Sequence, residues 1–137
     1  MTDLTPAALE AARAELADAG PIQMVNLLRY HVQADYGAET RFAPCSGRNA
    51  YYQRYIPAFG AIPGAEKSKI IWIGNVQATL VAPAGERWDD VAIVEYESFE
   101  AMRAIVESAQ YAREAEPHRR AALQDWRFLA ATKPGPG

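Results

Sequence analysis

The chain has 137 residues, with 14 Lys and Arg against 17 Asp and Glu, which gives a formal net charge of −3. A mildly acidic chain has no general attraction for nucleic acids or anionic lipid surfaces, because both bind clustered cations. The single cysteine, Cys45, excludes an internal disulfide. We therefore expect one globular unit that binds neither nucleic acid nor a membrane.

The first residues, Met-Thr-Asp-Leu-Thr-Pro, lack the basic and apolar regions of a secretory signal. No apolar run in the sequence approaches the roughly 20 residues that a membrane-spanning helix needs. A lone cysteine is also typical of proteins in a reducing compartment. These observations predict a cytoplasmic protein.

The first 20 residues predict a helical extension, followed by a strand. Thr5 is a candidate N-cap, Pro6 occupies the first helical position, and Gly20 follows the last turn. The run from Ile22 to Arg29 is apolar at both odd and even positions, as in a central strand covered on both faces. The first core strand is therefore expected here.

Residues 30–46 show no regular period, and a connection of this length is often a lid or a binding loop. An exposed insertion that wraps around a partner is an equal alternative. Ser46 is a candidate N-cap for a helix that begins near Gly47 and that Pro57 should end or kink. The aromatic face of this helix would carry Tyr51, Tyr55 and Phe59.

Two strands joined by a hairpin loop are predicted in the middle of the chain. Ile70 begins a long second strand that continues to Val81, with Gly74 as a candidate bulge. After a loop rich in Pro and Gly, residues 90–97 form the third strand. Because the connection is short, the two strands should pair antiparallel.

The last part of the chain predicts a helix, a second helical stretch and a closing strand. Ser98 is expected to cap the helix and Ser108 the second stretch, which Pro117 should disturb. The closing strand covers residues 126–131, and residues 133–137 are expected to form a flexible tail.

After the leading helix, the elements follow the order strand, helix, strand, strand, helix, strand. This is the ferredoxin-like βαββαβ pattern, an α+β fold with a four-stranded antiparallel sheet and helices on one face. We expect an extension over residues 1–20 and the ferredoxin-like domain over residues 21–132. Because the strands are apolar on both faces, the open side of the sheet must also be covered, which predicts a homodimer.

An ordered set of motifs runs through residues 21–131. Its members are Met24–Tyr30 (MVNLLRY), Ser46–Tyr51 (SGRNAY), Trp88–Tyr96 (WDDVAIVEY), Ser98-Phe99, Tyr111, His118-Arg119 and Asp125. This set resembles the family catalogued as domain of unknown function 1330. That family is similar to the dimeric α+β barrel superfamily, in which two sheets face each other and cavities lie between sheet and helices.

The resemblance implies a dimeric α+β barrel but does not select an activity. Members of that superfamily include cofactor-free oxygenases, isomerases, haem-dependent enzymes and ligand-sensing domains. Function has to be argued from the site and not from the fold.

Asn26 is a polar residue within an apolar strand, where an unpartnered amide would cost about 1 to 3 kcal/mol. Its side chain must therefore have a hydrogen-bond partner. Lining a cavity, it could orient a substrate carbonyl or dioxygen. Alternatively, it ties down a neighbouring loop.

His118 is the candidate acid/base group, because an unperturbed imidazole titrates near neutral pH. Tyr111 lies seven residues earlier, on the same face if the segment is an α-helix. Arg119 could bind a carboxylate or an enolate-like oxygen through a forked hydrogen bond. In the alternative interpretation, His118 and Arg119 only stabilise the carbonyls of a helix end, by about 0.3 to 1 kcal/mol.

Glu95 faces the core if Val91 and Ile93 do, and it is then expected to pair with Arg29 or to act as a general base. A set of aromatic residues could line the same cavity or simply fill the core. These residues are Tyr51, Tyr55, Trp72 and Trp88.

The sequence predicts neither a metal site nor a cofactor. The two histidines lie far apart, there is one cysteine, and no acidic cluster has the spacing of metal ligands. Haem, which needs only one axial histidine, stays open as an alternative.

These residues suggest a cofactor-independent enzyme, oxygenase- or isomerase-like, that acts on a small organic molecule in a cavity between sheet and helices. In this hypothesis Asn26 and Arg119 bind an oxyanion or a carboxylate, and His118 is the acid/base. Arg29, Tyr55, Trp72, Trp88, Glu95 and Tyr111 are the candidate substrate-binding residues. The alternative is a non-catalytic small-molecule-binding or dimerisation module.

Overall fold

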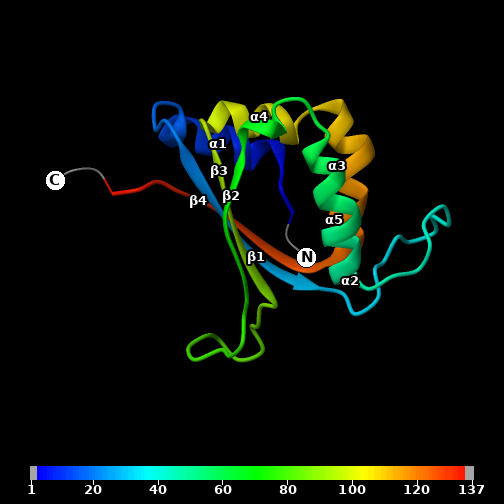
Figure 1. Ribbon diagram of the computed structural model, residues 1–137. Coiled ribbons are helices and arrows are strands. Elements are labelled where there is room, and N and C mark those ends of the chain that lie inside the picture. The colour runs from blue at the N-terminus through cyan, green and yellow to red at the C-terminus, as the bar shows by residue number, and fades with distance from the viewer. Residues whose placement is uncertain (1–2, 135–137) are drawn as a thin grey trace.

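The computed structural model describes residues 3–134, in which helices pack on one face of a four-stranded sheet (Figure 1). The strand order is β2-β3-β1-β4, and every neighbouring pair is antiparallel. This is the α+β, ferredoxin-like arrangement that the order of elements in the sequence predicted. Of the predicted tail, residues 135–137 lie outside the described part of the chain.

The four strands are β1 (Ile22–Tyr30), β2 (Lys69–Asn75), β3 (Asp90–Tyr96) and β4 (Leu123–Ala131). The helical elements are α1 (Pro6–Leu16), α2 (Gly47–Asn49), η1 (Ala50–Tyr55), α3 (Ile56–Gly60), the short 3-10 turn η2 (Ala65–Lys67), α4 (Phe99–Val106), η3 (Tyr111–Ala115) and α5 (Glu116–Ala122). Elements α2, η1 and α3 follow one another without a break, as do η3 and α5.

The predicted helix caps are present. Side-chain oxygens of Thr5, Ser46, Ser98 and Ser108 each accept a hydrogen bond from a backbone N–H three residues later, at 3.0 to 3.1 Å. Such a bond satisfies one of the free amides in the first turn of a helix. Local sequence therefore determines where these helical segments begin.

Side chains of β1 alternate between two environments. Its even-numbered residues, from Ile22 to Tyr30, are buried, and the residues between them are half-buried. In β3, Ala92 and Tyr96 are buried. The buried side chains point toward the helices, so the sheet presents its other face outward.

Each of the two long helical segments contains a π turn immediately before a proline. The defining bonds run five residues back, from the Ile56 N–H to the Tyr51 carbonyl and from the Glu116 N–H to the Tyr111 carbonyl. Pro57 and Pro117 come next in the sequence.

These π turns explain why neither proline ends its helix. Proline has no N–H, and in an α-helix its ring collides with the carbonyl four residues earlier. A π turn inserts one extra residue at this point, so the helix continues past the ring. The sequence predicted that Pro57 would end or kink the helix; the helix does not end there but continues to Gly60, with the π turn directly before the proline.

Strand β2 is shorter than expected and ends at Asn75, whereas the sequence suggested Val81. The pairing of β2 with β3 shifts between Ile70 and Trp72, not at Gly74. The absence of a side chain at Gly74 has another reason. A Cβ there would lie 2.1 Å from the indole of Trp72, which lies across the backbone.

Gly47 marks a point where three backbone segments meet. Its N–H donates to the carbonyl of His31 at 3.1 Å. A Cβ at this position would lie 2.3 Å from the carbonyl oxygen of His31 and 2.6 Å from that of Ala122. The start of α2 is thereby held against the ends of β1 and α5.

We expect Gly47→Ala to lower the free energy of unfolding by about 1 to 3 kcal/mol, because the new methyl group must displace backbone on two sides. Urea denaturation followed by circular dichroism would measure this loss. Gly60→Ala is the control, since nothing lies within 4 Å of a Cβ there. A Gly47→Ala variant as stable as Gly60→Ala would contradict the close approach.

Candidate functional site

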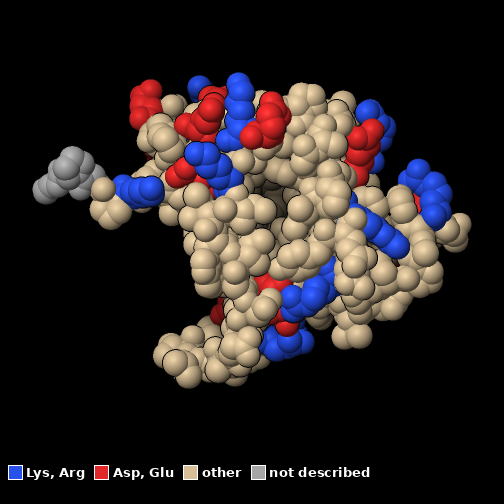
Figure 2. All heavy atoms as spheres, viewed as in Figure 1, with Lys and Arg blue, Asp and Glu red and all other residues tan. Residues whose placement is uncertain are grey.

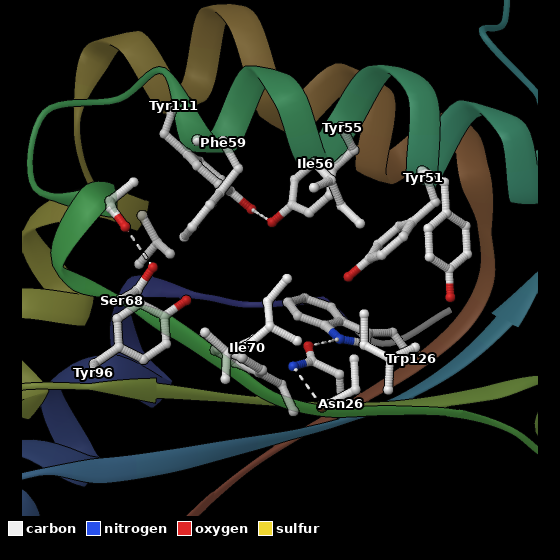
Figure 3. A pocket seen from close by; sticks show the side chains of 18 residues that line it. Asn26, Tyr51, Tyr55, Ile56, Phe59, Ser68, Ile70, Tyr96, Tyr111 and Trp126 are labelled. Atoms are coloured by element: carbon white, nitrogen blue, oxygen red, sulfur yellow. Dashed lines mark hydrogen bonds between the residues drawn. The ribbon is translucent and has the colours of Figure 1, made fainter.

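A cavity of about 340 Å³ lies between the sheet and the helical segments that contain the π turns (Figure 3). The sheet contributes Asn26, Ala92, Val94, Tyr96, Trp126 and Phe128, and the helical side contributes Tyr51, Tyr52, Tyr55, Ile56, Phe59 and Tyr111. None of the residues that line it is charged. The cavity therefore suits a largely apolar ligand.

The cavity opens beside the edge strand β2. Ile70 and Ile73 line it, yet they remain 56% and 38% exposed to solvent. Figure 2 shows this side of the molecule hollowed near its centre, with uncharged residues around the hollow. A small molecule can reach the interior here without separating the sheet from the helices.

Asn26 lies on the floor of the cavity and its amide is fully engaged. The Oδ1 atom accepts a hydrogen bond from Trp126 Nε1 at 3.0 Å. The Nδ2 atom donates to the carbonyls of Ala92 at 3.2 Å and Met24 at 3.4 Å. The amide thus holds an indole of the next strand in place, not a loop.

The roof of the cavity contains a pair of hydrogen-bonded phenols. The hydroxyl oxygens of Tyr55 and Tyr111 lie 3.0 Å apart (Figure 3). The Nε–H of Arg119 donates to the Tyr111 hydroxyl oxygen, also at 3.0 Å. Arg119 is 2% exposed and stacks on the ring of Trp126, with 4.5 Å between the guanidinium carbon and the ring centroid. It therefore lies behind the lining and reaches the cavity through Tyr111.

Arg119 stays charged despite its burial. Desolvation acts to lower its pKa, but the contacts with Tyr111 and with the carboxylate of Asp3 outweigh this effect and raise it. The Asp3 carboxylate accepts a hydrogen bond from Arg119 at 3.0 Å, and Glu116 lies 3.8 Å away. The guanidinium is therefore a permanent cation next to the cavity.

The phenols of Tyr51, Tyr55 and Tyr96 remain protonated. Burial is the main reason that the pKa values of Tyr51, Tyr55 and Tyr96 lie above the usual value for tyrosine. The hydroxyls of Tyr51 and Tyr96 have no hydrogen-bond partner among residues 3–134. They are therefore available to a ligand.

At another part of the lining, Tyr52 donates a hydrogen bond to Asp90 at 2.8 Å. The buried Asp90 carboxylate also accepts hydrogen bonds from Tyr30, Arg48 and Asn75, at 2.7 to 2.9 Å. Burial alone would raise the pKa of Asp90, but these donors together lower it. The ionised carboxylate ties the ends of β2 and β3 to helix η1.

The expectation that His118 shares a cavity with Asn26 is wrong. Its Nδ1 atom lies 2.7 Å from the hydroxyl of Tyr36, its ring packs edge-on against Phe42, and it is absent from the cavity lining. The extra residue of the π turn shifts the helical phase, so that Tyr111 meets Arg119 and not His118.

Of the predicted substrate-binding residues, Tyr55 and Tyr111 line the cavity and four others do not. Trp72 is 55% exposed on β2. Trp88 lies beside Arg127, with 5.0 Å between its ring centroid and the guanidinium carbon. These tryptophans therefore do not line the cavity as expected.

The expected pair of Glu95 with Arg29 is absent. Glu95 accepts a hydrogen bond from Gln23 at 2.7 Å, and Arg29 Nε has no hydrogen-bond partner among residues 3–134. Both β1 and β3 turn even-numbered side chains toward the helices and the cavity. Arg29 on β1 and Glu95 on β3 are therefore on the opposite face of the sheet.

Reasoning from the sequence missed several lining residues, above all Tyr96 and Trp126. Tyr96 shares the parity of Ala92 and Val94, so choosing the other parity of β3 as the core face excluded it. Trp126 pairs with Leu28 in the sheet. Paired residues point to the same face, so Trp126 lies on the face of Leu28 and Asn26. The even-numbered positions of β1 were therefore the sequence signal for this face.

Among residues 3–134, no group of three His, Cys, Asp or Glu side chains is arranged to hold a metal ion. Within the same range, no helix combines the length and the apolar character needed to cross a membrane.

No known family profile matches the chain, and no curated protein matches it. A crystal structure of RPA0582 from Rhodopseudomonas palustris, a protein of unknown function, is similar, with 34% sequence identity and a TM-score of 0.80. The match covers 98% of this chain and 97% of that one. The chain belongs to the family of RPA0582.

A crystal structure of methylated RPA0582 is also similar, at 33% identity and a TM-score of 0.77, over 100% of this chain and 97% of that one. Both matches extend over nearly the whole of this chain, so the α+β fold is shared with RPA0582. The resemblance to domain of unknown function 1330 stays a prediction.

The partial burial of His118 predicts a pH dependence of stability. Burial, followed by the nearby charges of Arg54 and Arg41, lowers the pKa of His118 below its ordinary value of 6.5. The folded state therefore disfavours the imidazolium. The contribution of His118 to the free energy of unfolding should be fully present above pH 6.5. It should be lost as the pH falls from 6.5 through the lowered pKa.

We expect His118→Asn to remove this decline, which thermal melts over a pH series would show. His31→Asn is the control and should retain it, because His118 is intact. An unchanged pH profile in His118→Asn would contradict the assignment.

Proposed function

We propose that this chain binds a small, largely aromatic molecule that has a hydrogen-bond acceptor oxygen and carries no compact ionic group such as a carboxylate or an ammonium. The observation that carries the proposal is an aromatic cavity of about 340 Å³ whose lining includes the hydroxyls of Tyr51 and Tyr96, which have no hydrogen-bond partner among residues 3–134. Known ligand sites of proteins typically have volumes of about 300 to 1,000 Å³ and combine apolar walls with a few polar groups.

The chemistry of the lining supports an aromatic ligand without a compact ionic group. Rings of Tyr51, Tyr55, Phe59 and Trp126 offer faces and edges on which another ring can stack. No charged residue lines the cavity, so a ligand carboxylate or ammonium group buried there would lose its hydration without a direct ionic partner.

Binding is better supported than acid/base turnover. Neither a histidine nor a carboxylate belongs to the lining, and tyrosines are the ionisable residues within it. The proposal is therefore a small-molecule-binding protein, and it assigns no catalytic role to His118.

We further propose that two copies associate through the open face of the sheet. Val25 on β1 pairs with Ile93 on β3 and with Leu129 on β4, so three apolar side chains lie side by side near the middle of this face. Trp72 and Leu129 are 55% and 52% exposed. An exposed apolar patch on a central sheet typically marks an interface, and a second copy offers the same patch in a two-fold arrangement.

Ligand binding is testable with 2-acetylnaphthalene, a neutral aromatic ketone, by isothermal titration calorimetry. Ile73→Trp places a bulky side chain at the mouth and should weaken binding about tenfold or more, a change of about 1.4 kcal/mol. Ile71→Trp is the matched control, because Ile71 is exposed on the same strand and does not line the cavity. The proposal would be contradicted if the unaltered protein did not bind the ketone, or if both variants bound it equally well.

The proposed dimer predicts that Val25→Lys yields a monomer. A lysine at this position would meet its own counterpart near the two-fold axis of an apolar interface, where like charges repel. Light scattering coupled to size-exclusion chromatography measures the mass. Leu80→Lys, which alters an exposed leucine in the loop between β2 and β3, should leave the mass at two chains. A monomeric unaltered protein would contradict the dimer.

A further inference from the structure

The roof of the cavity has one more hydrogen-bond donor than the protein uses. Tyr55 and Tyr111 carry one phenolic proton each, and a single hydrogen bond joins their oxygens. Arg119 donates to the Tyr111 oxygen and so occupies an acceptor position there. Whichever tyrosine donates to the other, one O–H remains without an acceptor among residues 3–134.

The positive charge of Arg119 favours one direction of the hydrogen bond between Tyr111 and Tyr55. An N–H from Arg119 on the Tyr111 oxygen polarises the Tyr111 hydroxyl and strengthens it as a donor to Tyr55. In the opposite direction, the Tyr111 oxygen would have to accept two hydrogen bonds. The favoured order runs from Arg119 through Tyr111 to Tyr55 and leaves the Tyr55 proton free at the cavity.

We propose that Tyr55 is the donor that recognises the acceptor oxygen of the ligand and that Arg119, acting through Tyr111, adapts this donor to an oxygen with anionic character. The ligand class is then an acidic phenol, which ionises in solution and binds with its phenolate oxygen at Tyr55. Arg119 is a positioning residue, because it lies behind the lining and does not touch the ligand.

The arrangement fits an oxygen whose charge is spread over a ring better than a compact carboxylate. The cation is separated from the ligand by two phenols, and its charge is shared with Asp3. A carboxylate ligand would have no direct ionic partner in the lining and would lose its hydration. A phenolate loses less hydration and gains a polarised donor.

This inference rests on the proposed function. A chromophoric phenol tests it separately from that function. The absorbance of 4-nitrophenol distinguishes its neutral and ionised forms, so a pH titration of the bound ligand gives the ratio of phenolate to phenol affinity. Tyr55→Phe and Arg119→Gln should each lower this ratio about tenfold or more relative to the unaltered protein. Loss of a merely structural contact would weaken both forms alike and leave the ratio unchanged.

Arg120→Gln is the matched control for the cation. Arg120 contacts the same carboxylates of Asp3 and Glu116, each at 3.2 Å, but is exposed and does not reach Tyr111. The ratio of phenolate to phenol affinity measured for Arg120→Gln should equal that of the unaltered protein. Should Arg119→Gln fail to fold, Tyr55→Phe, which loses only a hydroxyl, decides the question.

The outcomes are separable. If the protein binds 2-acetylnaphthalene but does not bind 4-nitrophenol, or binds it with the same ratio in Tyr55→Phe, this inference is overturned and the proposed function stands. If neither compound binds, both fail. A ratio that falls in Tyr55→Phe and Arg119→Gln but not in Arg120→Gln supports the inference.

Discussion

The hydrogen bond between the hydroxyls of Tyr55 and Tyr111 joins the two helical segments above the sheet, and the cavity depends on it. Each tyrosine belongs to a π turn, and each π turn precedes a proline. Buried Arg119 completes the network from behind and links it to Trp126 on the floor. Roof and floor are thus held at a fixed separation by polar contacts within an otherwise apolar site.

The order of elements could be predicted because it depends on local signals. Capping residues such as Ser46 and Ser98 identify helix starts, and apolar runs identify the strands. The orientation of β3 could not be predicted in this way. Its odd and even positions are both apolar, so Val91 and Ala92 are equally good candidates for the core face, and only packing in three dimensions decides between them.

The candidate site was predicted in part for a related reason. Asn26 could be singled out, because a polar side chain in a central strand must have a partner. The choice of His118 over Arg119 as the partner of Tyr111 assumed a regular α-helical period. One extra residue in η3 changes that period, and proline gave only an indirect sign of it. Irregular backbone is where reasoning from periodicity fails.

The two π turns make the lining sensitive to chain length. Successive residues of an α-helix are rotated by about 100° around its axis. Removing the inserted residue in either turn, together with replacing the proline that follows it, would therefore rotate every later side chain of that segment by roughly this angle while keeping the segment helical. A deletion paired with loss of the proline could exchange which side chains face a ligand, so related proteins could acquire different specificities through length changes with little other substitution.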